Sequence, residues 1–226
     1  MSSIKIILIS GGTGGHVFPA IALSEEMNRL LINHYILTDK RCKYIFETRN
    51  LNCKIINSST ISKNFLLMPV SLIKIFFGLI ESLLFFIKER PSLVIGFGGY
   101  TSLPSILAAK LLKVPIILHE QNAVMGKANK FLSNFSDFVA LTFKKTLHAP
   151  KKSIYTGIPI RNDFFLKKNF SKTINNKLRI LVLGGSQGAT VFSKIIPEII
   201  SLLNKKDLRK VTLIQQARKS DIKNLK

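Results

Sequence analysis

The stretch that decides the fold is "IKIILISGGTGGHVFPA", residues 4–20. Its apolar run from Ile4 to Ile9 leads into four glycines within five positions, followed by His16. Such a run is typical of a strand that is buried on both faces, as in a parallel sheet. From Pro19 to Leu31 apolar residues recur every three or four positions, which predicts a helix. We therefore expect a strand, a glycine turn and a helix in succession.

The same order repeats along the chain. Strands are predicted within "HYILTD" (34–39), "CKIINS" (53–58), "PSLVIGFGGY" (91–100), "VPIILHEQN" (114–122) and "FVALTF" (138–143), and a helix within "LPSILAAKLLK" (103–113). Alternating strands and helices indicate parallel βαβ units in an open α/β sheet. Ligands of such sheets bind beyond the carboxyl ends of the strands, where the glycine loops fall.

A second region begins after the polar segment 169–177. There "LRILVLGGSQGA", residues 178–189, repeats the design of strand, paired glycines and helix start. We predict a first Rossmann-like domain at residues 1–162 and the start of a second one at 163–226. Because only one helix and one strand follow, and a parallel sheet needs cover on both faces, we expect the second domain to be incomplete.

The chain is strongly basic, with a formal net charge of +22. Residues 1–143 hold 15 Lys and Arg against 8 Asp and Glu, and residues 144–226 hold 19 against 4. Phosphorylated substrates or an anionic membrane would suit this charge, and a general richness in Lys, Ile and Asn explains it equally well. Nucleic acid is not expected, since arginine-rich runs, RNA-binding aromatic motifs and zinc spacings are missing. The two cysteines, Cys42 and Cys53, have no metal-binding spacing and suit a reducing cytoplasm.

Glycine loops between a strand and a helix present free backbone N–H groups at the positive end of the helix dipole, which favours phosphate. The alternative is a tight turn without a ligand. The Gly-Lys-Ser/Thr ending of a P-loop is missing. In the dinucleotide fingerprint Gly12 and Gly14 fit, Val17 stands at the third glycine, and Asp39 lies where a ribose-binding acid would. A nicotinamide oxidoreductase therefore stays as a distant alternative.

Five motifs occur in a fixed order: "GGTGGHVFPA", "GFGGYTSLPSILAA", "HEQNAVMGKANK", "TGIPIR" and "GGSQGA". In these motifs the sequence resembles the MurG family of peptidoglycan glycosyltransferases, from Ile4 to about Gln216. The resemblance implies a GT-B fold and an inverting transfer of N-acetylglucosamine from its UDP donor to lipid I, forming lipid II. It also implies a peripheral enzyme on the cytoplasmic face of the bacterial inner membrane, with neither cofactor nor metal.

The resemblance also assigns roles to single residues. Donor contacts are implied for Thr13, Gly14, Gly15, Asn122, Arg161 and Ser186, and contacts to the acceptor diphosphate for Gly11, Gly12, Gly98 and Gly99. His16 is placed to take a proton from the attacking hydroxyl. Alternatively it caps the helix or orients the diphosphate, with Glu120 and Asn122 as competing polar groups.

The family segments that read uracil and the donor sugar do not occur in this sequence. We therefore expect that the 226 residues by themselves do not transfer the sugar. The alternative is a non-catalytic module that keeps only acceptor and membrane binding.

The apolar segment 65–87 has the length of a transmembrane helix, but Lys74 and Glu81 argue against insertion. On a helical wheel its small and polar residues share one sector, and the remaining arc is wholly apolar. We expect part of this arc to lie in an anionic membrane surface, through Phe76, Phe77, Leu79 and Ile80. The alternative is a helix fully covered by protein.

Overall fold

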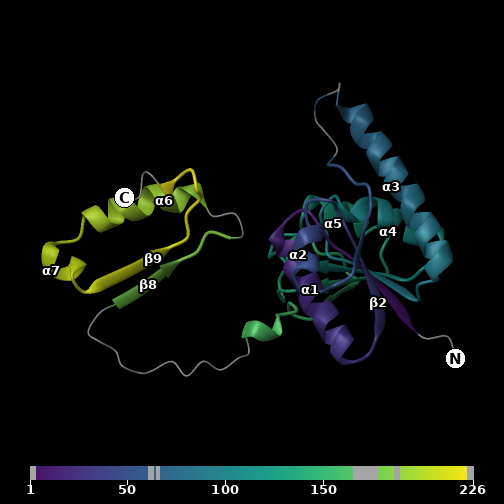
Figure 1. The fold of residues 1–226 in the computed structure, drawn as a ribbon, viewed down its shortest axis with the longest axis horizontal. Helices are drawn as coiled ribbons and strands as arrows, with labels where there is room; N and C mark the ends of the chain where they lie inside the picture. Colours follow the sequence, from purple (N-terminus) through teal and green to yellow (C-terminus); the bar gives the residue numbers. More distant parts are fainter. Residues whose placement is uncertain (1–3, 61–63, 65–66, 165–177, 186–188, 223–226) are drawn as a thin grey trace. The chain divides into compact units, whose positions relative to one another are not determined.

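The computed structural model describes residues 4–60, 64, 67–164, 178–185 and 189–222 (Figure 1). The chain divides into two units, Met1–Leu166 and Lys167–Lys226. The sequence placed this boundary between residues 162 and 163, and the structure places it between residues 166 and 167.

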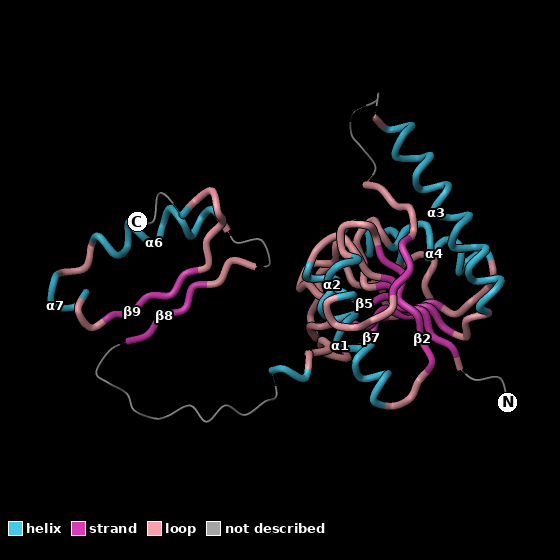
Figure 2. The backbone as a smooth tube through the Cα atoms, viewed as in Figure 1, coloured by secondary structure: helices cyan, strands magenta, loops and turns pink. Residues whose placement is uncertain are grey.

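Unit 1 is built on one sheet of seven parallel strands, which confirms the predicted open α/β sheet (Figure 2). The strands lie in the order β3-β2-β1-β4-β5-β6-β7. Their bounds are β1 Lys5–Ile9, β2 Asn33–Thr38, β3 Cys53–Ile55, β4 Leu93–Gly96, β5 Ile116–Glu120, β6 Phe138–Leu141 and β7 Ser153–Tyr155. Because β1 pairs with both β2 and β4, the turns that follow these three strands meet at one edge of the sheet.

The helices of unit 1 are α1 Gly14–Arg29, α2 Lys43–Glu47, α3 Met68–Glu89, α4 Ser102–Leu111 and α5 Lys127–Leu132, with a short 3-10 turn at Asn162–Phe164. Helix α1 begins at Gly14, five residues before the Pro19 start that apolar spacing predicts. The carbonyl oxygen of Thr13 accepts from the N–H groups of His16 and Val17, so the helix starts inside the glycine loop. Apolar periodicity misses this first turn because glycines form it. The short elements α2, α5 and β7 were not predicted.

The core of unit 1 fills both faces of the sheet. In β1, Ile7 and Ile9 point to one face and join the cluster formed with α3 and α4, whereas Ile6 and Leu8 point to the other and join the cluster formed with α1 and α2. This alternation follows from the two-residue period of a strand. Burial on both faces explains why the strand reads as a continuous apolar run.

Helix α3 packs along α4 through its small and polar sector. Ser71, Gly78 and Ser82 are buried, and the hydroxyl groups of Ser82 and Ser105 lie 2.8 Å apart. A Cβ atom on Gly78 would come within 1.8 Å of the Asn57 carbonyl oxygen, so only glycine fits there. The small residues of the polar sector thus face the protein, Lys74 and Lys88 of the same sector are exposed, and most of the apolar arc faces outward.

Unit 2 contains β8 Leu178–Val182, α6 Thr190–Ser201, α7 Lys205–Leu208 and β9 Val211–Gln215. Strands β8 and β9 form a parallel pair. Many large apolar side chains of the described residues are exposed, namely Leu178, Ile180, Leu181, Leu183, Val191, Ile195, Ile199, Leu202, Leu208, Ile214 and Ile222. The predicted linker at 169–177 lies outside the described residues.

Candidate active site at the carboxyl edge of the sheet

Two glycine loops, one after β1 and one after β4, lie against each other. A Cβ atom on Gly11 would come within 2.7 Å of the Thr101 side chain, so the loops approach more closely than larger residues allow. Gly12, Gly98 and Gly99 have φ angles of +85°, +89° and +75°. Because L side chains rarely adopt this conformation, the backbone here requires glycine.

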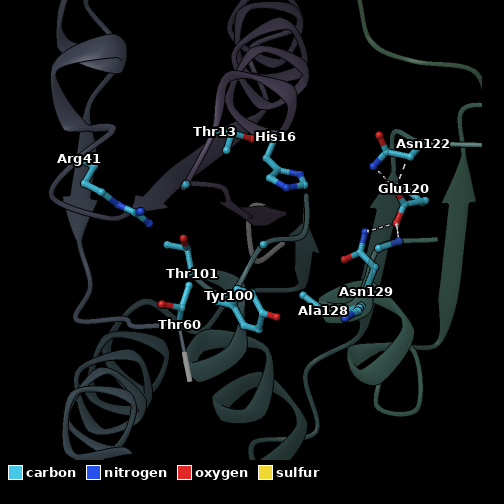
Figure 3. Close-up of a pocket in the computed structure, with 14 residues that line it drawn as sticks. Thr13, His16, Arg41, Thr60, Tyr100, Thr101, Glu120, Asn122, Ala128 and Asn129 are labelled. Atoms are coloured by element: carbon cyan, nitrogen blue, oxygen red, sulfur yellow. Dashed lines mark hydrogen bonds between the residues drawn. The ribbon is translucent and has the colours of Figure 1, made fainter. Parts of the chain in front are cut away.

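A cavity of about 420 Å³ opens between these loops and α5 (Figure 3). Its described lining residues come from the ends of β1, β2, β4 and β5, from Thr60 after β3 and from the start of α5, and all of them belong to unit 1. The lining residues are Gly12, Thr13, His16, Arg41, Thr60, Gly99, Tyr100, Thr101, Glu120, Asn122, Gly126, Lys127, Ala128 and Asn129. This is the position at which ligands of open α/β sheets bind.

Glu120 organises one wall of the cavity. Its carboxylate is fully buried and accepts from the backbone and side-chain N–H groups of Asn122 at 2.9 and 2.8 Å, from Gly126 N at 3.0 Å and from Asn129 Nδ2 at 2.9 Å. The dashed lines in Figure 3 follow these bonds. Since both oxygens are engaged, Glu120 holds the "HEQN" turn against α5, and four donors compensate its charge.

Asn129 adds an unused acceptor to the same wall. Its Nδ2 donates to Glu120 and to the His119 carbonyl oxygen, which fixes the orientation of the amide. Its Oδ1 is buried and has no hydrogen-bond partner among the described residues. Leaving such an atom unpaired is costly, and because it has almost no accessible surface, a ligand in the cavity does not reach it in this structure.

Asp39 is not among the described lining residues, but it binds three of them, Gly12, Arg41 and Thr101. Its carboxylate accepts from Gly12 N at 3.1 Å, from Cys42 N at 3.0 Å, from Thr101 Oγ1 at 3.3 Å and from Arg41 at 2.6 and 3.1 Å. Burial alone would raise the pKa of Asp39, but the Arg41 guanidinium and Cys42 together hold it below its usual range. A carboxylate occupied in this way does not receive a ribose, which removes the observation that favoured a nicotinamide enzyme.

Cys42 is an unreactive neighbour of this carboxylate. Burial, followed by the charge of Asp39, raises the pKa of its thiol to about 11. The thiolate is therefore scarce at neutral pH, and nucleophilic chemistry by this cysteine is not expected. Among the residues that the structure describes, no group of three or more His, Cys, Asp or Glu side chains is arranged to hold a metal ion.

His16 lies at the first turn of α1, and its ring extends into the cavity (Figure 3). Its Nδ1 lies 3.1 Å from Gln121 Oε1, and its Nε2 is on the side of Gly99. Its backbone oxygen accepts from the Ser10 hydroxyl group at 2.8 Å. One hydrogen bond, to Gln121, thus holds the imidazole, and the other ring nitrogen lies on the side of Gly99, which lines the cavity.

The other residues singled out from the sequence divide into three groups. Gly12, Thr13, Gly99 and Asn122 line the cavity, while Gly14 and Gly15 begin α1 beside it. Gly11 and Gly98 lie against Thr101 and Asn129. Arg161 is not among the described lining residues, and its guanidinium stacks 4.4 Å from the Phe18 ring. Ser186 lies outside the described residues.

Sequence reasoning missed eight of the described lining residues: Arg41, Thr60, Tyr100, Thr101, Gly126, Lys127, Ala128 and Asn129. A weak signal existed for six of them. Tyr100 and Thr101 directly follow the second glycine loop, and the "GKANK" segment contains Gly126, Lys127, Ala128 and Asn129. Arg41 gave no such signal, because its place depends on the pairing of β2 with β1.

Residues 6–141 match the model of the glycosyltransferase family 28 N-terminal domain. The chain belongs to glycosyltransferase family 28. Among curated relatives it is 39% identical over 233 residues to the UDP-N-acetylglucosamine--N-acetylmuramyl-(pentapeptide) pyrophosphoryl-undecaprenol N-acetylglucosamine transferase of Rickettsia bellii. It is 39% identical over 223 residues to the protein of the same name from Bartonella quintana. These matches confirm the resemblance to the MurG family.

A solved structure gives the same family and fold. The crystal structure of Acinetobacter baumannii MurG aligns with a TM-score of 0.71 at 25% identity and covers 97% of this chain. The predicted GT-B fold class, with one complete domain and an incomplete second one, is thereby confirmed. The alignment with the Rickettsia protein includes 98% of this family 28 chain and 64% of that relative. The alignment with the Bartonella protein includes 94% of this chain and 58% of that relative. It therefore spans less than two thirds of these relatives.

The surface of α3 is the second feature of this family 28 chain that concerns function. By length and composition alone, α3 is apolar enough to cross a membrane. Phe76 and Phe77 are 58% and 54% exposed and Ile80 is 36% exposed, whereas Leu79 is half-buried against the core. The outward face also carries Leu72, Ile73, Leu84 and Ile87.

Proposed function

We propose that unit 1 binds the diphosphate and the adjoining sugar of lipid I in the cavity at the carboxyl edge of the sheet. In this proposal the whole protein transfers N-acetylglucosamine from UDP-N-acetylglucosamine to that acceptor in peptidoglycan synthesis. The carrying observation is the cavity itself, in which two glycine loops, a histidine and the cations of Arg41 and Lys127 converge. The names of the relatives supply the substrates.

The diphosphate is assigned to the glycine side of the cavity. Gly11, Gly12, Gly98 and Gly99 form this side, and α1 begins beside it, so the positive end of the helix favours an anion there. The Gly12 N–H group is already taken by Asp39, so Gly12 serves through its conformation, as Gly99 does. The Arg41 guanidinium and the Lys127 ammonium are the charged donors that line this cavity among the described residues.

The acceptor sugar is assigned to the wall formed by Glu120 and Asn129. This wall is polar, since Glu120, Asn122 and Asn129 line it. The Tyr100 side chain lines the cavity between this wall and the glycine loop, as Figure 3 shows. Thr13, Gly14, Gly15, Asn122, Arg161 and Ser186 are proposed to contact the donor.

His16 is proposed as the general base. Its Nε2 takes the proton of the acceptor 4-hydroxyl group while that oxygen bonds to C1 of N-acetylglucosamine, and the bond from C1 to the UDP oxygen breaks. Proton transfer of this kind contributes typically about 10²–10⁴ in rate. In a protein of full family length we therefore expect His16→Ala to lower turnover by that factor while donor affinity changes little.

Residence at the cytoplasmic face of the membrane is also part of the proposal. Exposed apolar side chains on α3 would enter the lipid interface, and the exposed cations Lys74, Lys88 and Arg90 would meet anionic headgroups. Such a peripheral position would bring the acceptor, whose lipid chain stays in the bilayer, to the cavity.

A second candidate function is acceptor binding without transfer by these 226 residues. It is favoured by the observation that all lining residues belong to unit 1.

Calorimetric titration with a short-chain lipid I analogue tests the acceptor site, on which both candidate functions depend. Binding is expected to weaken strongly for an analogue that lacks the diphosphate. Equal affinity for both analogues, or no binding of either, would overturn the acceptor site. A radiolabelled UDP-N-acetylglucosamine assay on the same sample then separates transfer from binding.

A further inference from the structure

The environment of the Gln121 side chain fixes which end of its amide is the donor. Three acceptors surround Nε2: the carbonyl oxygen of Phe97 at 2.9 Å, and the carbonyl oxygen and Nδ1 of His119, each at 3.1 Å. Carbonyl oxygens can only accept hydrogen bonds. The His119 carbonyl oxygen also accepts from Asn129 Nδ2, but a flipped amide would turn its own oxygen toward the Phe97 carbonyl oxygen and His119 Nδ1 and remove their donor. Nε2 is therefore the NH₂ group.

His119 supports the same assignment from the other side. Its Nε2 lies 3.1 Å from the Gly157 carbonyl oxygen, so this nitrogen carries hydrogen. The His119 side chain is largely buried, and burial lowers its pKa, which keeps the ring neutral at neutral pH. A neutral ring with hydrogen on Nε2 has a free electron pair on Nδ1, and Gln121 donates to it.

The orientation of Gln121 in turn determines the state of His16. Since Gln121 Oε1 is an acceptor, the His16 Nδ1 that lies 3.1 Å away must carry hydrogen. We infer that Gln121 is a positioning residue for His16, holding it in the tautomer with hydrogen on Nδ1 and a free electron pair on Nε2 toward the cavity. No described residue hydrogen-bonds His16 Nε2, so this pair is available to a ligand.

The consequence for chemistry rests on the proposed function. A histidine that takes a proton from a hydroxyl group needs an unprotonated nitrogen facing that hydroxyl. The chain of hydrogen bonds from Gly157 through His119 and Gln121 to His16 supplies it before any substrate binds. The other tautomer would present an N–H group to the cavity, which suits a phosphate oxygen but removes the base.

The test is a long-range ¹H–¹⁵N correlation spectrum of the full 226-residue chain, recorded without substrate at a pH where the rings are neutral. His16→Asn assigns the His16 signals. The expected result is hydrogen on Nδ1 of His16 and on Nε2 of His119. Hydrogen on Nε2 of His16 in the unmodified chain would overturn the inference. Because no ligand is present, this outcome is independent of whether lipid I binds.

Two substitutions sharpen the assignment. Gln121→Met keeps the length of the side chain but cannot hydrogen-bond, and it should shift the His16 tautomer ratio toward Nε2–H by roughly two- to tenfold, the factor that one hydrogen bond is worth. Gln121→Glu keeps an acceptor opposite Nδ1 and should preserve the original tautomer. Ser105→Ala, which removes a buried hydrogen bond elsewhere in unit 1, is the matched control. An unchanged ratio in folded Gln121→Met would contradict the positioning role, and the spectrum of the unmodified chain decides if that variant does not fold.

Discussion

Units 1 and 2 begin with the same local design and reach different degrees of burial. In unit 1, Ile7, Leu8 and Val94 have no exposed side-chain surface, whereas Leu181 and Ile214 in the strands of unit 2 are each 61% exposed. Both units run from an apolar strand through paired glycines to a helix. The difference lies in the neighbours, because β1 is flanked by β2 and β4, whereas β8 pairs with β9 in a two-stranded sheet. A buried parallel strand depends on elements far away in sequence.

The same contrast holds for the glycine loops. In unit 1 the Gly12 N–H group meets a carboxylate from the end of β2, and the loop lies against a second one from β4. In unit 2 the Gly184 N–H group meets the side chain of Gln216, just after β9, at 3.0 Å. The loop of unit 1 thus belongs to a cavity to which four strand ends contribute. The loop of unit 2 has one described neighbour beyond its own strand and helix, the residue that follows β9. A glycine motif predicts a turn, while a binding site needs the strands beside it.

The largest expected difference between the units is in hydrogen exchange. A closed domain opens globally at a cost of about 5–15 kcal/mol, whereas an isolated two-stranded sheet is marginal in water. Amides of β1 and β4 should therefore exchange at least about 10³ times more slowly than those of β8 and β9, since 1.4 kcal/mol is a factor of ten. Mass spectrometry of peptides from each strand measures the ratio. Similar protection in both strand pairs would contradict this reading of the two units.

The sequence predicts the parts of the fold that leave a local pattern. The strands of unit 1 were predictable because burial on both faces leaves a long apolar run, as at Ile6 to Ile9. The start of α1 was not, because glycines form its first turn. The site was predictable where backbone geometry requires a residue type, as at Gly12 and Gly99. The role of Arg41 was not, since it depends on strand order.

The contact of α3 with the rest of unit 1 predicts the next largest effect. Gly78→Val would place side-chain atoms where the Asn57 carbonyl lies, so the helix or the loop must move. We expect a loss in the free energy of unfolding at the upper end of the roughly 1–3 kcal/mol that overpacking costs. Urea denaturation followed by circular dichroism measures it. Leu84→Ala on the exposed side of the same helix is the control, and equal losses in both variants would show that α3 does not pack as described.

Asp39 gives a smaller effect that depends on pH. Its pKa is below the usual value in the folded state, so its contribution is fully present above the unfolded pKa of about 4 and is lost as pH falls through the folded pKa. Asp39→Asn should destabilise unit 1 by about 1–2 kcal/mol at pH 6, because hydrogen bonds to the charged group are lost. The difference between wild type and variant should shrink at pH 3. Urea midpoints at both pH values test this, and a difference that does not change with pH would contradict the role of the charge.

The smallest expected effect on stability lies at the outer face of α3, where the structure separates folding from membrane binding. Phe76 and Phe77 are exposed, whereas Phe86 on the same helix is 2% exposed. Replacing both exposed rings with Ser should change the free energy of unfolding by no more than about 0.5 kcal/mol, as is usual for surface positions. Phe86→Ser, the matched control, should cost about 3–5 kcal/mol because it removes a ring from the core.

If the exposed rings enter lipid, each contributes up to roughly 1.5–3 kcal/mol to membrane affinity. Co-sedimentation with anionic vesicles should then detect weaker binding of the double variant at both low and high salt, since salt screens the charges and leaves the apolar contribution. Unchanged vesicle binding of a fully folded double variant would show that the exposed face of α3 does not contact the membrane.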